Sequence, residues 1–578
     1  MSEKPAKGMR QGLANYGDAG FSLFLRKAMI KGMGYSDDAL DRPIVGITDT
    51  FSGFNACHRT VPDLIRAIER GVMHAGGLPV VFPTVSVHEA FSHPTSMFLR
   101  NLMAMDTEEM IRAQPMDAVV LIGGCDKTVP AQLMGAASAG KPAAMVVTGP
   151  MMTGDFKGER LGACTDCRRL WAMHRAGEID EAEIDEVGGR LMPTAGTCMV
   201  MGTASTMALM TEALGMMLPG GAAIPAVHAD RLRHAEATGA RAVRMAEEGL
   251  TPDKIMTPAA FENALRMLLA IGGSTNGLVH LAAIAGRLGI EIDLEAFDRL
   301  GEETPVLVDL KPSGQHYMED LFRAGGAAPI LRALAPMLRL DALTISGRSL
   351  GAEIDAAPAD WGQTVVRGLD DPIYPKGGIA VLRGNLAPGG AIIKQSAAQQ
   401  DLLVHEGRAV VFDSLEDMAL RLDDPDLDVK PDDVLVLRNA GPKGAPGMPE
   451  AGYIPIPRKL ASRGVKDMVR ISDARMSGTA FGTIVLHISP EAAIGGPLAL
   501  VRDGDRIALD VPGRRLELLV GEEELRRRRS EWNPLEHAGS DRGYLKLYLD
   551  HVTQAERGCD FDFLEKPQRI ARTPLPTE

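Results

Sequence analysis

The chain has 578 residues, of which 45% are hydrophobic and 24% charged, an ordinary composition for a globular protein of two or three domains. Its formal net charge of −14 argues against nucleic-acid binding, because no basic stripe is available to displace counterions from phosphates. The first residues lack the apolar core of a secretory signal, no stretch approaches the ~20 apolar residues of a membrane span, and six cysteines form no disulfide framework. We therefore expect a cytoplasmic protein with free thiols, no membrane contact and no nucleic-acid partner.

The first part of the chain alternates short apolar runs with segments of helical periodicity. The apolar runs predict buried strands at residues 43–48, 78–83, 117–124 and 143–150. Helix-like segments lie between them, at Asp63–Ala75 and Met97–Ala113. This alternation predicts a mostly parallel α/β sheet, in which ligands bind at the carboxyl ends of the strands. Cys125 directly follows one predicted strand, and Glu89 lies just beyond another.

The second part of the chain is predicted to be rich in β-structure. Residues 205–300 have mostly helical periodicity, with the sequence GGSTNG at 272–277 between two apolar helices. A polar, proline-containing stretch follows around 354–376, and beyond it come short apolar runs separated by close turns. This pattern predicts a large α/β domain over residues 1–370 and a smaller, barrel-like β-rich domain over residues 371–578.

Three lone cysteines, far apart in sequence, each lie in a turn rich in Gly, Thr or Asp: Cys57, Cys125 and Cys198. A free cysteine is usually a small buried hydrophobe. The turn positions, and the Asp126-Lys127 pair that follows Cys125, favour metal ligation instead. Three thiolates can hold an iron–sulfur cluster while one iron remains short of a protein ligand, and an open iron is a Lewis acid.

The pair Cys164 and Cys167 forms a CxxC motif, which often indicates zinc or a redox pair. A structural zinc site needs a second pair of ligands at suitable spacing, and the sequence shows none. No thioredoxin-like context surrounds the motif either. We interpret the pair as structural or incidental, and a zinc protein built on it remains an alternative.

Glu89, Asp126 and Glu450 are acidic residues in turns made otherwise of small or apolar groups. If these carboxylates converge, their burial requires a cation, and a hard metal such as Mg²⁺ is the natural occupant. Separate, solvated carboxylates are the alternative that these residues alone leave open. Lys127 is either the ion-pair partner of Asp126 or, if carbamylated, a further oxygen ligand.

Ser477, in the sequence DARMSGTAFG, lies in a glycine-flanked turn before a predicted strand. Such a turn presents a hydroxyl and backbone N–H groups to a ligand, although most serines in turns of this kind are structural. The sequence contains no GxSxG elbow, no GxxxxGK[ST] loop and no strand-linked GxGxxG loop. A hydrolase nucleophile, a nucleoside triphosphate and a dinucleotide cofactor are therefore not indicated.

Taken together, these motifs resemble the dihydroxy-acid dehydratase/6-phosphogluconate dehydratase family over nearly the whole chain. The shared motifs occur in the family's order: GGCDKTxP, GTCxxMGTA, GGSTN, GPxGxPE and DxRxSG. The resemblance implies an iron–sulfur cluster on Cys57, Cys125 and Cys198. It implies an Mg²⁺ ion surrounded by Glu89, Asp126, carbamylated Lys127 and Glu450. It also makes Ser477 the base, with Lys127 as a second catalytic residue and Thr479 as a substrate contact.

Three further segments resemble the sugar-acid branch of that family: FKGER at 156–160, MGTASTM at 201–207 and the tail at 542–564. This branch typically carries a [2Fe–2S] cluster, and [4Fe–4S] is the alternative because three cysteines suit either. The family forms dimers or dimers of dimers, so the resemblance implies a homodimer or homotetramer.

The expected reaction is the dehydration of a 2,3-dihydroxy carboxylate, a sugar acid such as arabinonate, xylonate, gluconate or galactonate, to the 2-keto-3-deoxy acid. In it the open iron takes the 3-hydroxyl, Mg²⁺ binds the carboxylate and 2-hydroxyl, and Ser477 removes the C2 proton. The nearest alternative is a branched-chain 2,3-dihydroxy-acid dehydratase that converts 2,3-dihydroxyisovalerate to 2-ketoisovalerate, or an enzyme of broad range. A non-catalytic iron–sulfur sensor is a further alternative.

Overall fold

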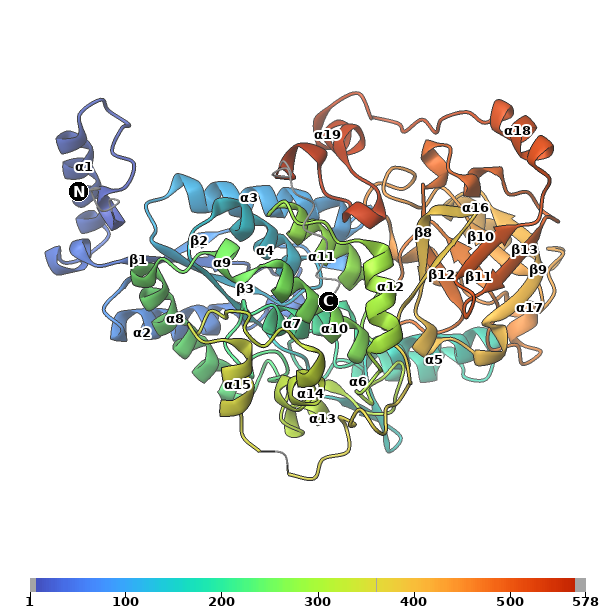
Figure 1. Ribbon diagram of the computed structural model, residues 1–578, viewed down its shortest axis with the longest axis horizontal. Coiled ribbons are helices and arrows are strands. Elements are labelled where there is room, and N and C mark those ends of the chain that lie inside the picture. The colour runs from blue at the N-terminus through green and yellow to red at the C-terminus, as the bar shows by residue number, and fades with distance from the viewer. Residues whose placement is uncertain (1–6, 360, 567–578) are drawn as a thin grey trace.

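The computed structural model describes residues 7–359 and 361–566, which form an α/β region followed by a β-barrel region (Figure 1). The α/β region contains a four-stranded parallel sheet with the order β2-β1-β3-β4. Its strands are β1 (Ile44–Asp49), β2 (Leu78–Pro83), β3 (Ala118–Gly123) and β4 (Ala143–Val147). The predicted parallel α/β sheet is confirmed.

Helices cover both faces of this sheet. They are α2 (Val61–His74), α3 (Arg100–Ala113), α4 (Thr128–Ala139) and α8 (Ala229–Glu248). Val45 and Ile47 share one apolar cluster with α2 and α8, whereas Val119 and Leu121 share another with α3 and α4. Because successive side chains of a strand point to opposite faces, β1, β3 and β4 each supply both clusters.

Helices α2 and α8 pack backbone against backbone. A Cβ on Gly71 would lie 1.9 Å from the carbonyl oxygen of Glu236, and one on Gly239 would lie 2.3 Å from that of Ile68. Glycine is therefore required at both positions for this close approach.

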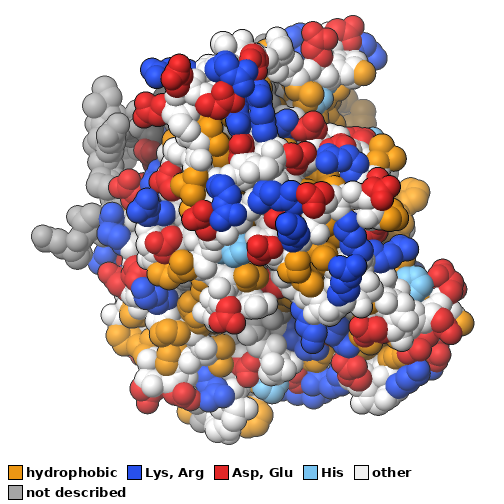
Figure 2. All heavy atoms as spheres, turned by 90° about the vertical axis from the view of Figure 1, so that its right-hand side faces the viewer, with side chains coloured by type: hydrophobic (Ala, Val, Ile, Leu, Met, Phe, Trp, Pro, Cys, Tyr) orange, Lys and Arg blue, Asp and Glu red, His pale blue; other side chains and the backbone are white. Residues whose placement is uncertain are grey.

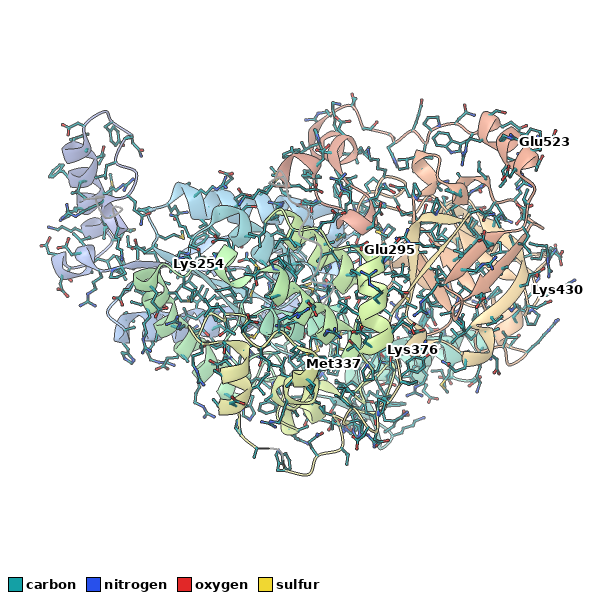
Figure 3. The ribbon with its side chains drawn as sticks, in the orientation of Figure 1. Lys254, Glu295, Met337, Lys376, Lys430 and Glu523 are labelled. Atoms are coloured by element: carbon teal, nitrogen blue, oxygen red, sulfur yellow. The ribbon has the colours of Figure 1, made fainter. Side chains whose placement is uncertain are left out.

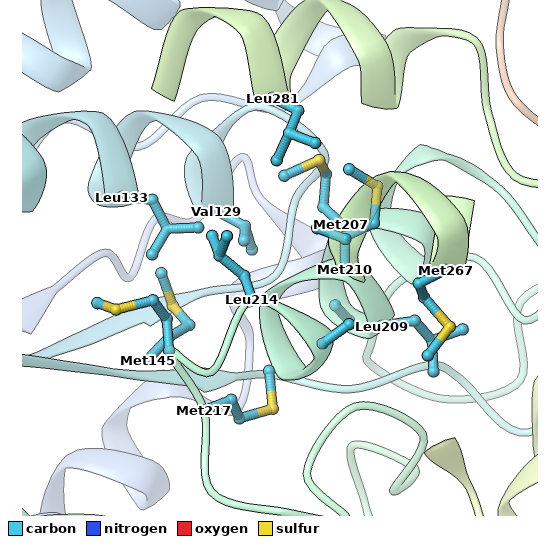
Figure 4. Packing of buried hydrophobic residues seen from close by; sticks show 14 of the residues in the cluster. Val129, Leu133, Met145, Met207, Leu209, Met210, Leu214, Met217, Met267 and Leu281 are labelled. Atoms are coloured by element: carbon cyan, nitrogen blue, oxygen red, sulfur yellow. The ribbon is translucent and has the colours of Figure 1, made fainter. Parts of the chain in front are cut away.

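A methionine-rich helical layer lies between the sheet and the rest of the molecule. It consists of α7 (Thr203–Ala213), α10 (Pro258–Ala270) and α11 (Asn276–Gly286). Figure 4 shows Met207 and Met210 of α7 packed among Val129 of α4, Met267 of α10 and Leu281 of α11. Every residue of α7 is buried, so the GGSTN turn between α10 and α11 lies inside the protein.

The remaining helices surround this core. In the α/β region they are α1 (Ala19–Gly32), α5 (Thr165–Ala176), α6 (Glu181–Arg190), α9 (Pro252–Ile255), α12 (Leu294–Glu303), α13 (Met318–Arg323), α14 (Ala327–Leu334) and α15 (Leu350–Ala356). Later in the chain they are α16 (Leu415–Arg421), α17 (Arg458–Ala461), α18 (Glu522–Glu531) and α19 (Gly543–His551). Within residues 7–359 and 361–566, none of these helices combines the length and apolar character needed to span a bilayer.

The second region is a closed barrel with the strand order β10-β11-β12-β8-β7-β14-β13-β9. Its strands are β7 (Ala380–Gly384), β8 (Ala387–Ile393), β9 (Val404–Phe412), β10 (Val434–Leu437), β11 (Arg470–Ser472), β12 (Ile484–Ser489), β13 (Arg506–Asp510) and β14 (Arg515–Leu518). The predicted barrel-like region is confirmed, although the sequence did not indicate β8, which contains Pro-Gly-Gly, or the three-residue β11. A short strand, β5 (Gly154–Phe156), pairs with β6 (Glu159–Leu161) outside both sheets.

The outside of the barrel carries charges of both signs. Figure 2 shows Lys and Arg interspersed with Asp and Glu over this face. Lys430 and Glu523 lie at its outer edge in Figure 3.

After the barrel the chain returns to the α/β region, where α19 lies above α3 and α11 (Figure 1). The Tyr544 hydroxyl donates to the carbonyl of Phe98 at 2.8 Å. The fully buried Arg100 donates to the carbonyls of Gly558 and Cys559 at 2.7 and 2.9 Å. These bonds fasten the end of the described chain to α3, next to the turn that carries Glu89.

Candidate active site

The three lone cysteines lie at the carboxyl edge of the parallel sheet. Cys125 follows β3, and Cys57 lies in a short 3-10 turn between β1 and α2. The sulfurs of Cys57 and Cys125 and a ring nitrogen of His88 all lie within 4.8 Å of one another. The turn that precedes Cys198 joins them, because the Gly196 N–H donates to the carbonyl of Ala56 at 3.5 Å. We refer to Cys57, Cys125 and Cys198 as the thiol cluster.

Hydrogen bonds shift the pKa values of Cys57 and Cys125 in opposite directions. Bonds from Cys125 and His88 lower the pKa of the Cys57 thiol to about 6, although burial opposes them. The bond to Cys57, together with burial, raises the pKa of Cys125. Cys57 is therefore a thiolate at neutral pH, held beside a thiol that a metal ion can deprotonate on binding.

Two histidines that the sequence did not single out support this edge. The Nε2 atom of His58 accepts from the backbone N–H groups of Gly124 and Cys125, each at 3.0 Å. Its Nδ1 lies 2.8 Å from the carbonyl of Thr50 and therefore carries the proton. Burial lowers the pKa of His58 to about 4, which keeps the ring neutral. His58 thus fixes the turn before Cys125, and His88 contacts the thiols directly. The only sequence features that could have indicated these roles were the positions of His58 next to Cys57 and of His88 next to Glu89.

The CxxC pair, which we interpreted as structural or incidental, begins α5 next to the thiol cluster. The Cys164 sulfur lies 3.5 Å from that of Cys198. The Cys167 thiol instead donates to the carbonyl of Cys164 at 2.8 Å, a contact within the first turn. All six cysteines are free. Cys164 therefore belongs to the surroundings of the site, whereas Cys167 has a local partner.

The three acidic residues converge around a fully buried lysine. Lys127 bonds to Asp126, and its Nζ lies 3.4 Å from Glu89 and 3.9 Å from Glu450. On the other side, fully buried Arg475 reaches Glu450 at 2.5 Å and Glu89 at 3.0 Å. We refer to these three carboxylates with Lys127 and Arg475 as the carboxylate cluster. Arg475 was not predicted; its place two residues before Ser477 was the only signal.

The two cations nearly balance the carboxylate cluster. Three negative and two positive side chains leave a net charge of −1. Burial alone would raise the pKa of Glu89, but the charges of Lys127 and Arg475 bring it well below its usual range. Burial would likewise lower the pKa of Lys127, and the surrounding carboxylates raise it instead. For Glu450 burial prevails and the pKa is raised. The cluster is therefore a place where negative charge is held in a low dielectric.

Ser477 follows β11 of the barrel, in a turn that is linked to the carboxylate cluster. Its Oγ lies 2.8 Å from the Thr479 hydroxyl. The side-chain amide of Asn276, from the GGSTN motif, donates to the Met476 carbonyl at 3.0 Å and lies 3.4 Å from Glu450. Asn276 therefore ties the serine turn to the carboxylate cluster. Glycine is required at position 478, between Ser477 and Thr479, because a Cβ there would lie 2.5 Å from the Cβ of Ser274.

The site thus joins side chains from both regions of the chain. The sheet edge contributes Cys57, Glu89, Cys125, Asp126 and Lys127, and the barrel contributes Glu450, Arg475, Ser477 and Thr479. Sulfur, carboxylate and hydroxyl groups lie in adjoining contacts. A soft metal centre, a hard cation and a base are the functions that these donors suit.

Comparison with known proteins gives a family match over most of the chain. Residues 42–353 match the family described as "Dihydroxy-acid/6-phosphogluconate dehydratase N-terminal". Residues 364–559 match the corresponding C-terminal family. The first match contains the thiol cluster, and the second contains Glu450 and Ser477.

Three relatives align with the chain over nearly their whole length. L-arabinonate dehydratase from Rhizobium leguminosarum bv. trifolii is 48% identical, over 95% of this chain and 95% of its own. L-arabonate dehydratase from Azospirillum brasilense is 49% identical, over 94% of each chain. 6-Deoxy-6-sulfo-D-gluconate dehydratase from Pseudomonas putida is 43% identical, over 93% of each chain.

Proposed function

The chain belongs to the dihydroxy-acid/6-phosphogluconate dehydratase family, and we propose that it is a hydro-lyase that dehydrates a sugar acid to the 2-keto-3-deoxy acid. Arabinonate, xylonate, gluconate and galactonate are the proposed substrates. Relatives named for arabinonate and sulfogluconate support this substrate class. The observation that carries the proposal is the convergence of the thiol cluster, the carboxylate cluster and Ser477 from two regions of the chain.

The thiol cluster fits an iron–sulfur cluster. Its three cysteines are free, Cys57 and Cys125 are buried, and their sulfurs lie within 4.8 Å of each other. Soft thiolates select iron–sulfur clusters over hard cations. We propose that Cys57, Cys125 and Cys198 hold a [2Fe–2S] cluster, and iron and sulfide counts distinguish it from [4Fe–4S].

The carboxylate cluster fits Mg²⁺. Glu89, Asp126 and Glu450 would hold the ion, since carboxylate oxygens are its preferred protein ligands. Carbamylation of Lys127 would replace a positive charge by a negative one and change the net charge of the cluster from −1 to −3. A divalent cation offsets that charge. When bound, the two metal groups supply a Lewis acid for the leaving hydroxyl and positive charge beside the substrate carboxylate.

Ser477 is the proposed base that takes the C2 proton. Serine is ordinarily far too weak a base, so its deprotonated form must be stabilised by its surroundings. The Thr479 hydroxyl, 2.8 Å away, can donate to Ser477 Oγ and is the proposed substrate contact. The charge of Arg475, two residues earlier in the chain, favours the same form. The chain therefore supplies both a proton acceptor and the groups that keep it deprotonated.

Replacement of the base tests this assignment. Ser477→Ala is expected to keep the iron–sulfur colour and to lose about 10²–10⁴-fold in kcat, the usual contribution of general base catalysis. Ser414→Ala is the matched control, because Ser414 caps α16 on the barrel, away from the site. Near-normal turnover by Ser477→Ala would remove Ser477 as the base.

A substrate screen tests the proposed function itself. Protein purified without oxygen is incubated with each aldonate and with 2,3-dihydroxyisovalerate, and the keto acid formed is measured. We expect 2-keto-3-deoxy acid from at least one aldonate, at a higher kcat/KM than for dihydroxyisovalerate. Preference for dihydroxyisovalerate would indicate a branched-chain enzyme. Bound cluster without any turnover would indicate a sensor.

We further propose that the protein is a homodimer or homotetramer and that its two regions are domains of residues 1–370 and 371–578. An oligomer is supported by the apolar side chains that α1 exposes at the left edge of Figure 1, where Phe24 and Met29 are each 65% exposed and could be covered by another subunit. The division into two domains is supported by the family matches, the first of which ends at residue 353 and the second of which begins at residue 364. Light scattering on the purified protein tests the oligomeric state.

A further inference from the structure

Lys394 is a buried lysine that the proposed reaction does not yet use. It directly follows β8 and is only 1% exposed. Within the described residues, Lys127 and Lys394 are the two buried lysines, and they differ in their partners. Lys127 lies among three carboxylates, whereas no acidic oxygen of the described chain lies within 4.0 Å of Lys394 Nζ. A buried ammonium without a counter-ion is costly, so its position calls for a reason.

The contact that Lys394 makes is with the serine turn. Its Nζ donates to the carbonyl oxygen of Gly478 at 3.1 Å. Gly478 is the residue between Ser477 and Thr479. Lys394 therefore lies behind the turn that presents the proposed base.

The bonded carbonyl and the serine lie at opposite ends of one peptide group. The Gly478 carbonyl and the Thr479 N–H belong to the same peptide, and that N–H points to Ser477 Oγ at 3.5 Å. Hydrogen bonds connected in series through a peptide polarise one another. When the positively charged Lys394 donates to the Gly478 carbonyl oxygen, the Thr479 N–H therefore becomes a stronger donor to a negatively charged Ser477.

The other carbonyls of the turn are held by neutral donors. Asn276 donates to the carbonyl of Met476 at 3.0 Å, and the Thr165 hydroxyl donates to that of Thr479 at 3.0 Å. Hydrogen bonds from a charged donor are about twice as strong as neutral ones. Of these three bonds, the one from Lys394 is therefore best suited to influence the charge on the serine. Burial lowers the pKa of Lys394 to about 7, so a substantial fraction is protonated at neutral pH.

We propose that Lys394 is a positioning residue for the base: it holds and polarises the Gly478–Thr479 peptide so that the Thr479 N–H stabilises deprotonated Ser477. This role rests on the proposed function of Ser477 as the acceptor of the C2 proton. Lys394 touches neither the substrate nor the metal ligands in this role. Its removal should slow proton removal specifically and leave substrate binding and cluster assembly intact.

The test compares Lys394→Met with wild type and with Lys459→Met. Methionine is unbranched like lysine and only one atom shorter, and it lacks the charge. Lys459 is the matched control, because its Nζ also donates to a backbone carbonyl, that of Pro425 at 3.1 Å, and it contacts none of the proposed site residues. The substrate is the best aldonate of the screen, with hydrogen or deuterium at C2. Turnover is expressed per bound cluster, which removes the effect of incomplete folding or loading.

For Lys394→Met we expect kcat per cluster to fall by about 10–100-fold, as for residues that orient a catalytic group. KM and cluster content should remain within about twofold of wild type, and the C2-deuterium isotope effect on kcat should equal or exceed that of wild type. Lys459→Met should match wild type throughout. Unchanged kcat per cluster would overturn the proposal, because Lys394 would then act only on folding. A lower kcat with a smaller isotope effect would also overturn it, because another step would have become slow.

A second variant guards against poor folding of the first. Lys394→Gln keeps a neutral donor, and its isotope effect, being a ratio, does not depend on the amount of active protein. We expect a kcat per cluster between those of wild type and Lys394→Met; a value equal to that of wild type would overturn the role of the charge. If wild type turns over no aldonate, the proposed function fails and the role of Lys394 fails with it. If wild type is active and both Lys394 variants are as active per cluster as wild type, only the role of Lys394 is overturned and the proposed function stands.

Discussion

The thiol cluster and the carboxylate cluster meet at Cys125 and Asp126, yet their charges are balanced in opposite ways. Cys57 is hydrogen-bonded to Cys125 and His88, Cys125 also bonds to Asp126, whose Oδ1 lies 3.6 Å from its sulfur, and Cys198 bonds to Cys164. The carboxylates are instead bonded to two buried cations, Lys127 and Arg475. A metal bound to the thiols must therefore supply the positive charge of that cluster. The carboxylate cluster already contains most of the positive charge that it needs, on Lys127 and Arg475.

This difference predicts different responses to metal loss. Thiolates that gather without a cation repel one another, so the thiol cluster should be stable only when loaded or protonated. The carboxylate cluster should keep its arrangement without Mg²⁺, because its ion pairs are buried and nearly balanced. The two sites can therefore be emptied separately.

Cys125→Ser should have the largest effect, because it removes a ligand from the thiol cluster. We expect colourless protein with no measurable turnover, checked by visible absorbance and iron counts. Cys559→Ser is the matched control, since Cys559 is also buried and free but contacts Met448 in another apolar cluster. A coloured, active Cys125→Ser protein would end the assignment of Cys125 as a ligand.

Removal of Mg²⁺ by a chelator should have the next largest effect. Metal stabilisation of a developing charge is worth several kcal/mol, so we expect turnover to fall by about 10²–10³-fold and to return when Mg²⁺ is restored. Colour should not change. If Lys127 is an ammonium, the unfolding midpoint should change little, because Lys127 and Arg475 still balance the carboxylates; if Lys127 is carbamylated, the midpoint should fall, because a net charge of −3 is left without its cation. Loss of colour together with activity would contradict the separation of the two clusters.

Glu450→Gln should have a smaller effect on the same cluster. The amide keeps the shape of the side chain but removes one negative charge, so the net charge of the cluster becomes less negative by one. Mg²⁺ affinity should then fall by about 10–100-fold, measured as the Mg²⁺ concentration that gives half-maximal turnover. Glu406→Gln, which breaks an exposed ion pair with Arg506 on the barrel, is the control and should bind Mg²⁺ normally. Equal Mg²⁺ dependence in both variants would exclude Glu450 as a ligand.

The sheet edge could be predicted from the sequence because local pattern determines it. A run of apolar residues that ends at Gly124 must place Cys125 at the carboxyl end of a buried strand, and β3 does so. The approach of Glu450 and Ser477 to Asp126 could be inferred only from the family resemblance. No local pattern states how a barrel more than 300 residues away packs on that edge.

The residues that support the site could not be predicted, because their roles depend on long-range contacts. Lys394 follows an apolar run and would be taken for a solvated lysine at the end of a strand; it is buried because β8 pairs with β12, next to the serine turn. His58 acts through backbone N–H groups of a turn 66 residues later. Arg475 bonds to Glu89, which lies 386 residues earlier. Such side chains are identified only once the fold has brought their partners together.

The smallest effect is expected for Cys164→Ser, which tests how many sulfurs the thiol cluster contains. The Cys164 sulfur is only 3.5 Å from that of Cys198, so proximity alone does not separate a neighbour from a ligand. If the ligands are three, Ser at 164 should keep full colour and change kcat by no more than about twofold, the size of a substitution that removes no essential partner. Cys167→Ser, next to the same helix turn, is the control. Loss of colour in Cys164→Ser alone would mean that a fourth thiolate completes the coordination of the iron. The cluster would then lack the open position on which the proposed dehydration depends, and the Mg²⁺ ion proposed for the carboxylate cluster would be the only Lewis acid left at the site.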